Sequence, residues 1–356
     1  MHASKSFRPA ACALALGLAG LAPSARALDI VLTQDPSSTL STQQLAAFEA
    51  AASYWESRLS DKVTVYIQVG FGNLGANVLA EASSAKLALD YADLRGLLAS
   101  DARSATDASA VSHLQPGAAL SFMATQGDLS ARLDNDGSTN NSRLFLTTAN
   151  AKALGTDAGT SLSQPDAVIT FGNAFASSFA YERSQLAGDK MDFITVAQHE
   201  IGHALGFISG VDGIDNCAGA ANACGLEAAA NRFETLPWFY ALDLYRYSAP
   251  GTLDLRVGGS PYFSVDGGAT AVQAFSTGET FGNGWQASHF GTGVLTLMKP
   301  TVSFGQAYDA TASDLMALDA IGWDLAAPVP EPASYALLLG GLGVIGWARR
   351  RRGLSA

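Results

Sequence analysis

Two histidines and a glutamate stand close together in one apolar segment of the chain. His199 and His203 are four residues apart, and Glu200 follows the first of them. The apolar residues around them recur at helical spacing, so both imidazoles are expected to leave one face of a helix, one turn apart. That spacing lets two imidazoles bind one tetrahedral zinc ion. The segment therefore predicts a zinc site with His199 and His203 as ligands and Glu200 as the general base that activates water.

A catalytic zinc needs a third protein ligand, which this segment does not supply. Gly206 follows His203 by three residues and is placed to end the helix in a left-handed turn. The pattern H-E-x-x-H-x-x-G resembles the start of the metzincin signature. The compact form of that signature has a third histidine at the position of Ser209, so this chain departs from it and must take its third ligand from elsewhere.

His289 is the best candidate for that third ligand. It lies in Ala-Ser-His-Phe at residues 287–290, and Met298 follows shortly after it. This arrangement resembles the leishmanolysin-like metzincins, in which the helix motif ends in Gly-Phe, an insertion follows, and a Ser-His-aromatic segment precedes a Met-turn. The matching positions are Gly206, Phe207, Ser288, His289 and Met298. The resemblance implies a zinc peptidase with a two-lobed α+β fold, a twisted mixed sheet, an active-site helix and a C-terminal lobe. Met298 would then form a hydrophobic floor beneath the histidines.

Other residues stay open as the third ligand. Asp212 lies just beyond the expected end of the helix, and some metzincins use an aspartate. Glu227 or Glu234 would suit a thermolysin-like plan, in which a glutamate from a later helix completes the site. Gly206 and Met298 fit that second plan poorly.

The two ends of the chain have the composition of export signals. Residues 1–27 combine a basic start, an apolar run and a final Ala-Arg-Ala, which is typical of a secretory signal removed by signal peptidase. Residues 326–332 form a proline-rich linker with a Pro-Glu-Pro motif, 333–348 an apolar segment of nearly membrane-spanning length, and 349–356 a basic tail expected to stay cytoplasmic. Residues 28–325 are left as the catalytic domain.

The C-terminal end resembles the PEP-CTERM sorting signal of exopolysaccharide-producing Gram-negative bacteria, whose tail an exosortase-type enzyme processes near the Pro-Glu-Pro motif. The resemblance implies a protein at the cell surface or in the extracellular matrix, with a transient anchor in the inner membrane. A plain C-terminal anchor is the alternative. Contact with the membrane is expected only through residues 333–348. The net charge of −11 disfavours a nucleic-acid partner, because an acidic chain repels phosphate backbones.

The chain has three cysteines, of which Cys12 leaves with the predicted signal. Cys217 and Cys224 are then a lone pair in an exported protein. An oxidising compartment favours a disulfide between them, closing a small loop rich in glycine and alanine.

The pattern of apolar residues and caps predicts an α+β fold with helices packed on a sheet. Strands are expected at residues 30–33, 63–69, 76–82 and 167–171, and helices at 41–59, 84–99, around the histidine pair, and at 313–323 with Ser313 as its cap. Ser41 and Gln44 have the spacing of a capping box. The strand at 167–171 is expected to be the sheet edge along which an extended peptide lies.

Asp134-Asn135-Asp136-Gly137, followed by Asn140, places oxygen-bearing side chains alternately before a glycine, as in calcium-binding loops. The distal bidentate glutamate of such loops is missing from this stretch. A solvated turn is the favoured interpretation, and a bound Ca²⁺ ion is the alternative.

Together these features predict an exported zinc endopeptidase that acts on proteins or peptides. Two alternatives stay open: a non-catalytic surface-binding or matrix-binding protein on the same fold, and a zinc hydrolase of a non-peptide substrate. Glu200 argues against the first alternative, because a binding module has no need of that carboxylate.

Overall fold

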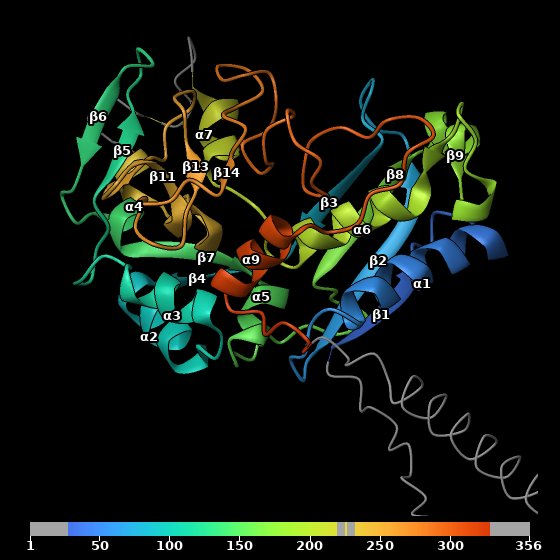
Figure 1. The fold of residues 1–356 in the computed structure, drawn as a ribbon, viewed down its shortest axis with the longest axis horizontal. Helices are drawn as coiled ribbons and strands as arrows, with labels where there is room; N and C mark the ends of the chain where they lie inside the picture. Colours follow the sequence, from blue (N-terminus) through green and yellow to red (C-terminus); the bar gives the residue numbers. More distant parts are fainter. Residues whose placement is uncertain (1–27, 219–224, 226–231, 328–356) are drawn as a thin grey trace, which may run out of the picture.

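The computed structural model describes residues 28–218, 225 and 232–327 of the chain. Within these residues it is a mixed α+β structure with several sheets (Figure 1). The predicted signal peptide and all of the sorting tail from residue 328 lie outside the described residues. The residues that the structure describes contain no helix long and apolar enough to cross a membrane.

The main sheet has the strand order β1-β2-β8-β3. Its strands are β1 (Asp29–Gln34), β2 (Thr64–Gly72), β8 (Ala167–Gly172) and β3 (Ala80–Ser84). The first three strands run parallel, and β3 runs antiparallel to β8, with Ala82 opposite Ile169. The strand predicted at 167–171 is therefore present, but the prediction that it is the sheet edge is wrong. It lies between β2 and β3, and the edge strands are β1 and β3.

Two long helices pack on the main sheet and against each other: α1 (Thr42–Glu56) and α6 (Phe193–Ala204) (Figure 1). Their contact is aromatic. Phe48 of α1 lies edge-on to Phe193 of α6, with ring centroids 4.9 Å apart, and Phe171 of β8 stacks on Phe193 at 4.3 Å. These buried rings join both helices to one strand of the sheet. Aromatic pairs of this geometry stabilise the fold beyond the free energy gained by burial alone.

The N-terminus of α1 confirms the predicted capping box. The side chain of Ser41 accepts a hydrogen bond from the backbone N–H of Gln44, and the side chain of Gln44 accepts one from the N–H of Ser41. The last helix, α9 (Ala312–Ala320), is present as predicted, but Thr311 and Asp314 form its capping box instead of Ser313.

The helix predicted at 84–99 is wrong in its first part. Residues there form the strand β4 (Lys86–Asp90), and α2 (Tyr91–Asp101) starts only after it. β4 pairs antiparallel with β7 (Arg143–Thr147), which places Leu87 opposite Leu146. Pairing with a distant strand overrides the local helical pattern. The strand predicted at 76–82 is also displaced, since β3 starts at Ala80.

The remaining elements are short. In chain order they are α3 (Ala105–Ser112), β5 (Phe122–Thr125), β6 (Ala131–Asp134), α4 (Thr139–Ser142), α5 (Thr148–Ala153), η1 (Asn173–Ser178), β9 (Phe179–Ala180), η2 (Arg183–Gln185), β10 (Met191–Asp192), α7 (Val211–Cys217), α8 (Arg232–Thr235), η3 (Ala241–Tyr245), β11 (Arg246–Ala249), β12 (Thr252–Leu253), β13 (Tyr262–Phe263) and β14 (Gln273–Ala274). β5 and β6 form a hairpin, and β12-β11-β13-β14 form a second sheet. Figure 1 shows the β5–β6 hairpin and the second sheet to the left of the main sheet, with α9 in between.

The segment predicted as a solvated turn after Asp134 is partly buried. Asp134, Asn140 and Asn141 are fully buried, and α4 occupies the end of the segment. Asp136 is exposed. The prediction therefore holds for Asp136 and is wrong for the three buried residues.

Candidate metal centre

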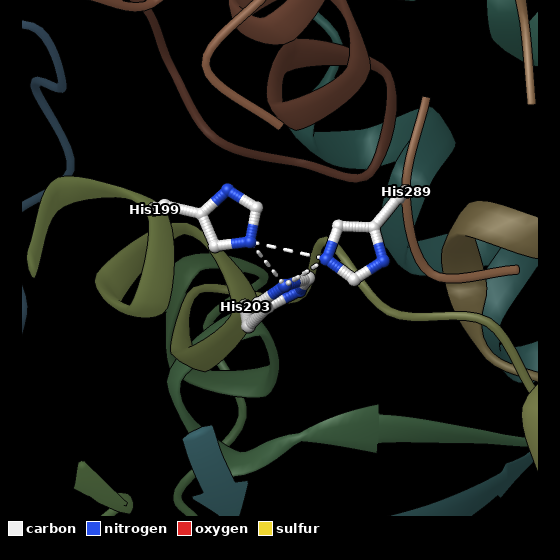
Figure 2. Close-up of side chains that lie close together, drawn as sticks. All are labelled: His199, His203 and His289. Carbon is white, nitrogen blue, oxygen red and sulfur yellow. Dashed lines mark hydrogen bonds between the residues drawn. The ribbon is translucent and has the colours of Figure 1, made fainter. Parts of the chain in front are cut away.

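Three imidazoles converge in the structure, two from α6 and one from the long loop between β14 and α9 (Figure 2). The Nε2 atoms of His199 and His203 are 3.0 Å apart. The Nε2 atom of His289 lies 3.1 Å from that of His199 and 3.2 Å from that of His203. The structure thus brings together the three histidines that the sequence analysis named as zinc ligands.

The hydrogen bonds at Nδ1 determine whether each Nε2 atom carries a proton or a free lone pair. Each Nδ1 is paired with a backbone carbonyl: His199 with Leu297 at 2.8 Å, His203 with Phe207 at 2.6 Å, and His289 with Gln286 at 3.2 Å. A carbonyl oxygen only accepts hydrogen bonds, so we assign the proton of each neutral ring to Nδ1. Each Nε2 then directs a bare lone pair at the other two.

Burial makes protonation of the triad unfavourable. It lowers the pKa of His199, lowers that of His203 to about 3 with a further contribution from the charge of His199, and lowers that of His289 well below the usual range. The three lone pairs repel one another unless a cation lies between them. The site therefore has the chemistry of a metal-binding site.

The spacing and the donor type fit zinc. Tetrahedral bonds of about 2.0–2.1 Å would place the ligand nitrogens roughly 3.3 Å from one another. The observed separations of 3.0–3.2 Å are only slightly shorter. Imidazole nitrogen suits zinc and other transition metals rather than calcium or magnesium, and carbonyls on the second ring nitrogen are the partners that orient metal-binding histidines.

Glu200 lies on the same helix between the two histidines and is 5% exposed. Burial, followed by the charge of Glu81 on the edge strand β3, raises the pKa of Glu200 to about 8. A cation held by the triad would act in the opposite direction and favour the carboxylate. Glu200 is thus a buried carboxyl group beside the triad.

Met298 packs against α6 at Gly202, the residue before His203. It is 1% exposed, and a Cβ added to Gly202 would lie 2.6 Å from its sulfur. Asp314 of α9 accepts hydrogen bonds from the backbone N–H groups of Leu297 and Met298, at 2.9 and 3.1 Å. Because the Leu297 carbonyl also accepts from His199, the cap of α9 is connected to the first imidazole through two hydrogen bonds.

The segment carrying His289 is held by Asp212 of α7. The Asp212 carboxylate accepts hydrogen bonds from the backbone N–H groups of Ala287 and Ser288 and from the hydroxyl of Ser288. Asp212, the rival candidate for the third ligand, lies outside the triad and contacts the two residues that precede His289. No local pattern in the sequence indicated this supporting contact.

The other candidates of the sequence analysis lie elsewhere. Glu234 lies beside Asp134 and Asp136, in a cluster separate from the imidazoles. Cys217 ends α7 and is disulfide-bonded. Its predicted partner Cys224 and the rival ligand Glu227 lie outside the described residues.

Comparison with known proteins informs only the C-terminal end. Residues 328–352 match the PEP-CTERM protein-sorting motif. The chain therefore carries the signature of an exported protein that is sorted to the cell surface in Gram-negative bacteria, and the motif is one that exosortases recognise. This match confirms the predicted sorting signal. No curated protein and no solved structure matches the chain.

Proposed function

We propose that this exported protein is a zinc-dependent endopeptidase with a metzincin-like, two-lobed catalytic domain. The observation that carries the proposal is the set of three Nε2 lone pairs within 3.2 Å of one another, with the buried carboxyl group of Glu200 beside them. An imidazole triad leaves the fourth position of a tetrahedral zinc free for water or substrate, as in catalytic sites.

His199, His203 and His289 would hold the ion. Zinc bound there supplies a Lewis acid that polarises a carbonyl and makes water more acidic. Glu200 would take the proton from the attacking water and pass it to the leaving amine. The carbonyls of Leu297 and Phe207 keep the proton of their histidines on Nδ1, which leaves Nε2 free for the metal.

The edge strand β3 favours an extended peptide as substrate. Hydrogen-bonded and non-hydrogen-bonded pairs alternate along an antiparallel ladder. The N–H of Gly172 donates to the Leu79 carbonyl at 2.9 Å. In this register the backbone N–H and C=O groups of Glu81 and Ser83 also face β8. The backbone N–H and C=O groups of Ala80, Ala82 and Ser84 consequently point away from β8, toward the open edge of the sheet. A peptide would add there as a further strand, next to α6, which β3 contacts.

The test compares the purified full chain with His289→Ala, Glu200→Gln and, as a control, His113→Ala, whose imidazole is exposed and lies outside the triad. Zinc per chain and casein hydrolysis are measured for each. We expect one zinc in the wild type and in Glu200→Gln, with hydrolysis by Glu200→Gln reduced about 10²- to 10⁴-fold. We expect loss of zinc in His289→Ala and no change in the control.

Two results would change the assignment. If His289→Ala still holds zinc and cleaves casein, the third ligand lies elsewhere. If the wild type binds zinc but cleaves no protein, a non-peptide substrate or a binding role replaces the peptidase.

A further inference from the structure

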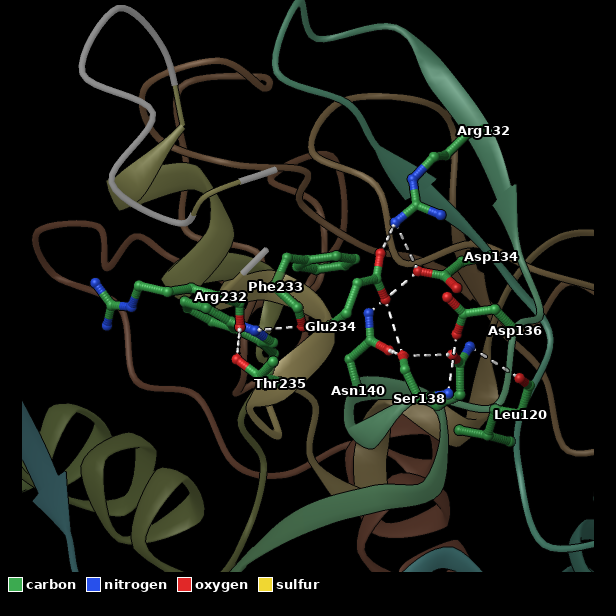
Figure 3. A network of polar contacts seen from close by, with 12 residues as sticks. Leu120, Arg132, Asp134, Asp136, Ser138, Asn140, Arg232, Phe233, Glu234 and Thr235 are labelled. Atoms are coloured by element: carbon green, nitrogen blue, oxygen red, sulfur yellow. Dashed lines mark hydrogen bonds and ion pairs between the residues drawn. The ribbon is translucent and has the colours of Figure 1, made fainter. Parts of the chain in front are cut away.

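A second cluster of charged side chains lies on the hairpin side of the fold (Figure 3). Asp134 ends β6, Asp136 follows it, and Glu234 is part of α8, and one carboxylate oxygen from each lies within 4.8 Å of the others. Arg132 contacts two of them, with Nη2 2.9 Å from Asp134 and in close contact with Glu234. One guanidinium against three carboxylates leaves the cluster with an excess of negative charge.

Asp134 has an oxygen that nothing in the described structure satisfies. Its side chain is 0% exposed. Oδ2 accepts hydrogen bonds from Arg132 at 2.9 Å and from the amide of Asn140 at 3.1 Å, whereas Oδ1 is buried without a partner. In Figure 3 the Asp134 carboxylate is directed toward that of Asp136. A buried carboxylate oxygen is ordinarily hydrogen-bonded or bound to a metal, and among the described residues this atom has neither.

The hydroxyl of Ser138, which lies next to the cluster, has more acceptor oxygens around it than its one proton can satisfy. Ser138 Oγ lies 2.5 Å from Oδ1 of Asn140, 3.1 Å from Oδ1 of Asn141 and 2.9 Å from Oε2 of Glu234. A hydroxyl has one proton, so it satisfies one of these three oxygens. The excess of acceptors remains if the O and N atoms of either asparagine amide are exchanged. In the present orientation the nitrogen of Asn140 donates to Asp134 and that of Asn141 donates to the Leu120 carbonyl, and an exchange would lose these bonds.

We propose that this cluster binds one Ca²⁺ ion, with Asp134, Asp136 and Glu234 as its carboxylate ligands. The donors are all oxygen, which suits calcium or magnesium and not zinc. Carboxylates mixed with amide oxygens in an irregular array favour calcium, which takes 6–8 oxygen ligands in flexible geometry. The local sequence pattern lacked its distal glutamate, and Glu234 brings one from a remote part of the chain.

The ion would connect three pieces of the fold: the β5–β6 hairpin, α4 and α8. Ser138 at the start of α4 already contacts Glu234 of α8 through its hydroxyl. Calcium would neutralise the carboxylates that otherwise repel each other across this contact. An exported protein meets free calcium at concentrations that fill even weak sites, with Kd values of about 10⁻⁴–10⁻³ M. The site would thus stabilise the fold after export, independently of the zinc chemistry.

Calcium binding is tested on the full, zinc-loaded chain after calcium has been removed by dialysis against calcium-free buffer. CaCl₂ is titrated by calorimetry, and ⁴⁵Ca bound per chain is counted after equilibrium dialysis. The variant is Asp136→Asn, and the control is Asp128→Asn. Both aspartates are exposed and accept a hydrogen bond from the backbone N–H two residues on, at 2.9 Å in each case, but Asp128 lies outside the cluster.

We expect one Ca²⁺ per chain in the wild type and the control. Asp136→Asn should weaken binding about a hundredfold or more, since loss of an outer-shell partner alone weakens metal sites by roughly 10- to 100-fold. Calcium should raise the melting temperature of the wild type and the control but not of Asp136→Asn. Absence of saturable binding by the wild type, or wild-type affinity in Asp136→Asn, would overturn the proposal and leave Arg132 as the counter-ion that the described residues supply. Zinc content, measured in parallel, reports separately on the peptidase proposal.

Discussion

Replacing Asp212 by asparagine tests the contact that holds His289 in the triad. The carboxylate accepts three hydrogen bonds from Ala287 and Ser288, directly before His289. Asparagine keeps one acceptor oxygen and puts an N–H donor in place of the other, so at least one bond is lost and two donors face each other. A hydrogen bond to a charged group contributes about 1.5–3 kcal/mol.

Part of that loss will appear as a displaced His289 and therefore as weaker zinc binding. A loss of about 1.4–2.8 kcal/mol in binding corresponds to a roughly 10- to 100-fold higher Kd. This is the range found when an outer-shell partner of a zinc ligand is removed, roughly 10- to 100-fold. We expect Asp212→Asn to fall in this range and Asp212→Ala to bind zinc more weakly still.

The measurement is the zinc Kd, obtained by competition with a chromophoric chelator, together with the melting temperature. Asp215→Asn is the matched control. Asp215 lies on the same helix, is 2% exposed, and accepts hydrogen bonds from the backbone N–H groups of Thr280 and Phe281 at 2.7 and 2.8 Å. It should lose comparable stability and keep its zinc affinity. Wild-type affinity in Asp212→Asn, or an equal loss in Asp215→Asn, would refute the positioning role of Asp212.

Three other changes test the floor of the site, the edge strand and the buried acids. Gly202→Ala places a Cβ 2.6 Å from the sulfur of Met298, so the floor must shift; we expect a stability loss of about 1–3 kcal/mol in urea unfolding and lower peptidase activity. Ala82→Pro removes an outward N–H of β3, and we expect a higher KM for peptides with zinc content unchanged. Burial and the charge of Asp324 raise the pKa of Asp61 to about 7. The folded state then binds more protons than the unfolded state between about pH 4 and 7. Stability should therefore fall as the pH rises through this window, by roughly 1 kcal/mol per pH unit, and Asp61→Asn should flatten the profile.

Each of these changes has a control or a contradicting result. Full stability and activity in Gly202→Ala would show that Met298 moves freely. Ser83→Pro, whose N–H faces β8, should destabilise the sheet, whereas Ala82→Pro should not. A stability profile that is unchanged in Asp61→Asn would assign the pH dependence to Asp101 or Asp319, whose pKa values burial raises to about 6.

Local signals in the sequence were sufficient for part of the site. The i, i+4 spacing of His199 and His203 fixes their common face on any helix, because helical geometry repeats every 3.6 residues. The capping box of Ser41 and Gln44 is likewise local, and the structure contains it. The sorting signal is a linear pattern that needs no fold, and it matched.

Those local signals do not show which residues that are distant along the chain come into contact. His289 was proposed from a resemblance, and its approach to the helix pair depends on the loop that Asp212 and Ser288 hold. Asp212 is recognisable in the sequence as an acidic residue close to the helix motif, but no local pattern shows that its oxygens accept hydrogen bonds from backbone N–H groups.

The largest corrections concern strand pairing and side-chain burial, which are properties of the whole fold. Residues 86–90 have a pattern compatible with a helix, and only the partner β7 makes them a strand. The position of β8 inside the sheet depends on β3 pairing beside it. Asp134 and Glu234 meet only because α8 folds back onto the hairpin. The sequence by itself determined the common helical face of His199 and His203 and the presence of the sorting signal. The tertiary structure decided which distant side chains complete each cluster, because pairing and burial depend on residues that are remote along the chain.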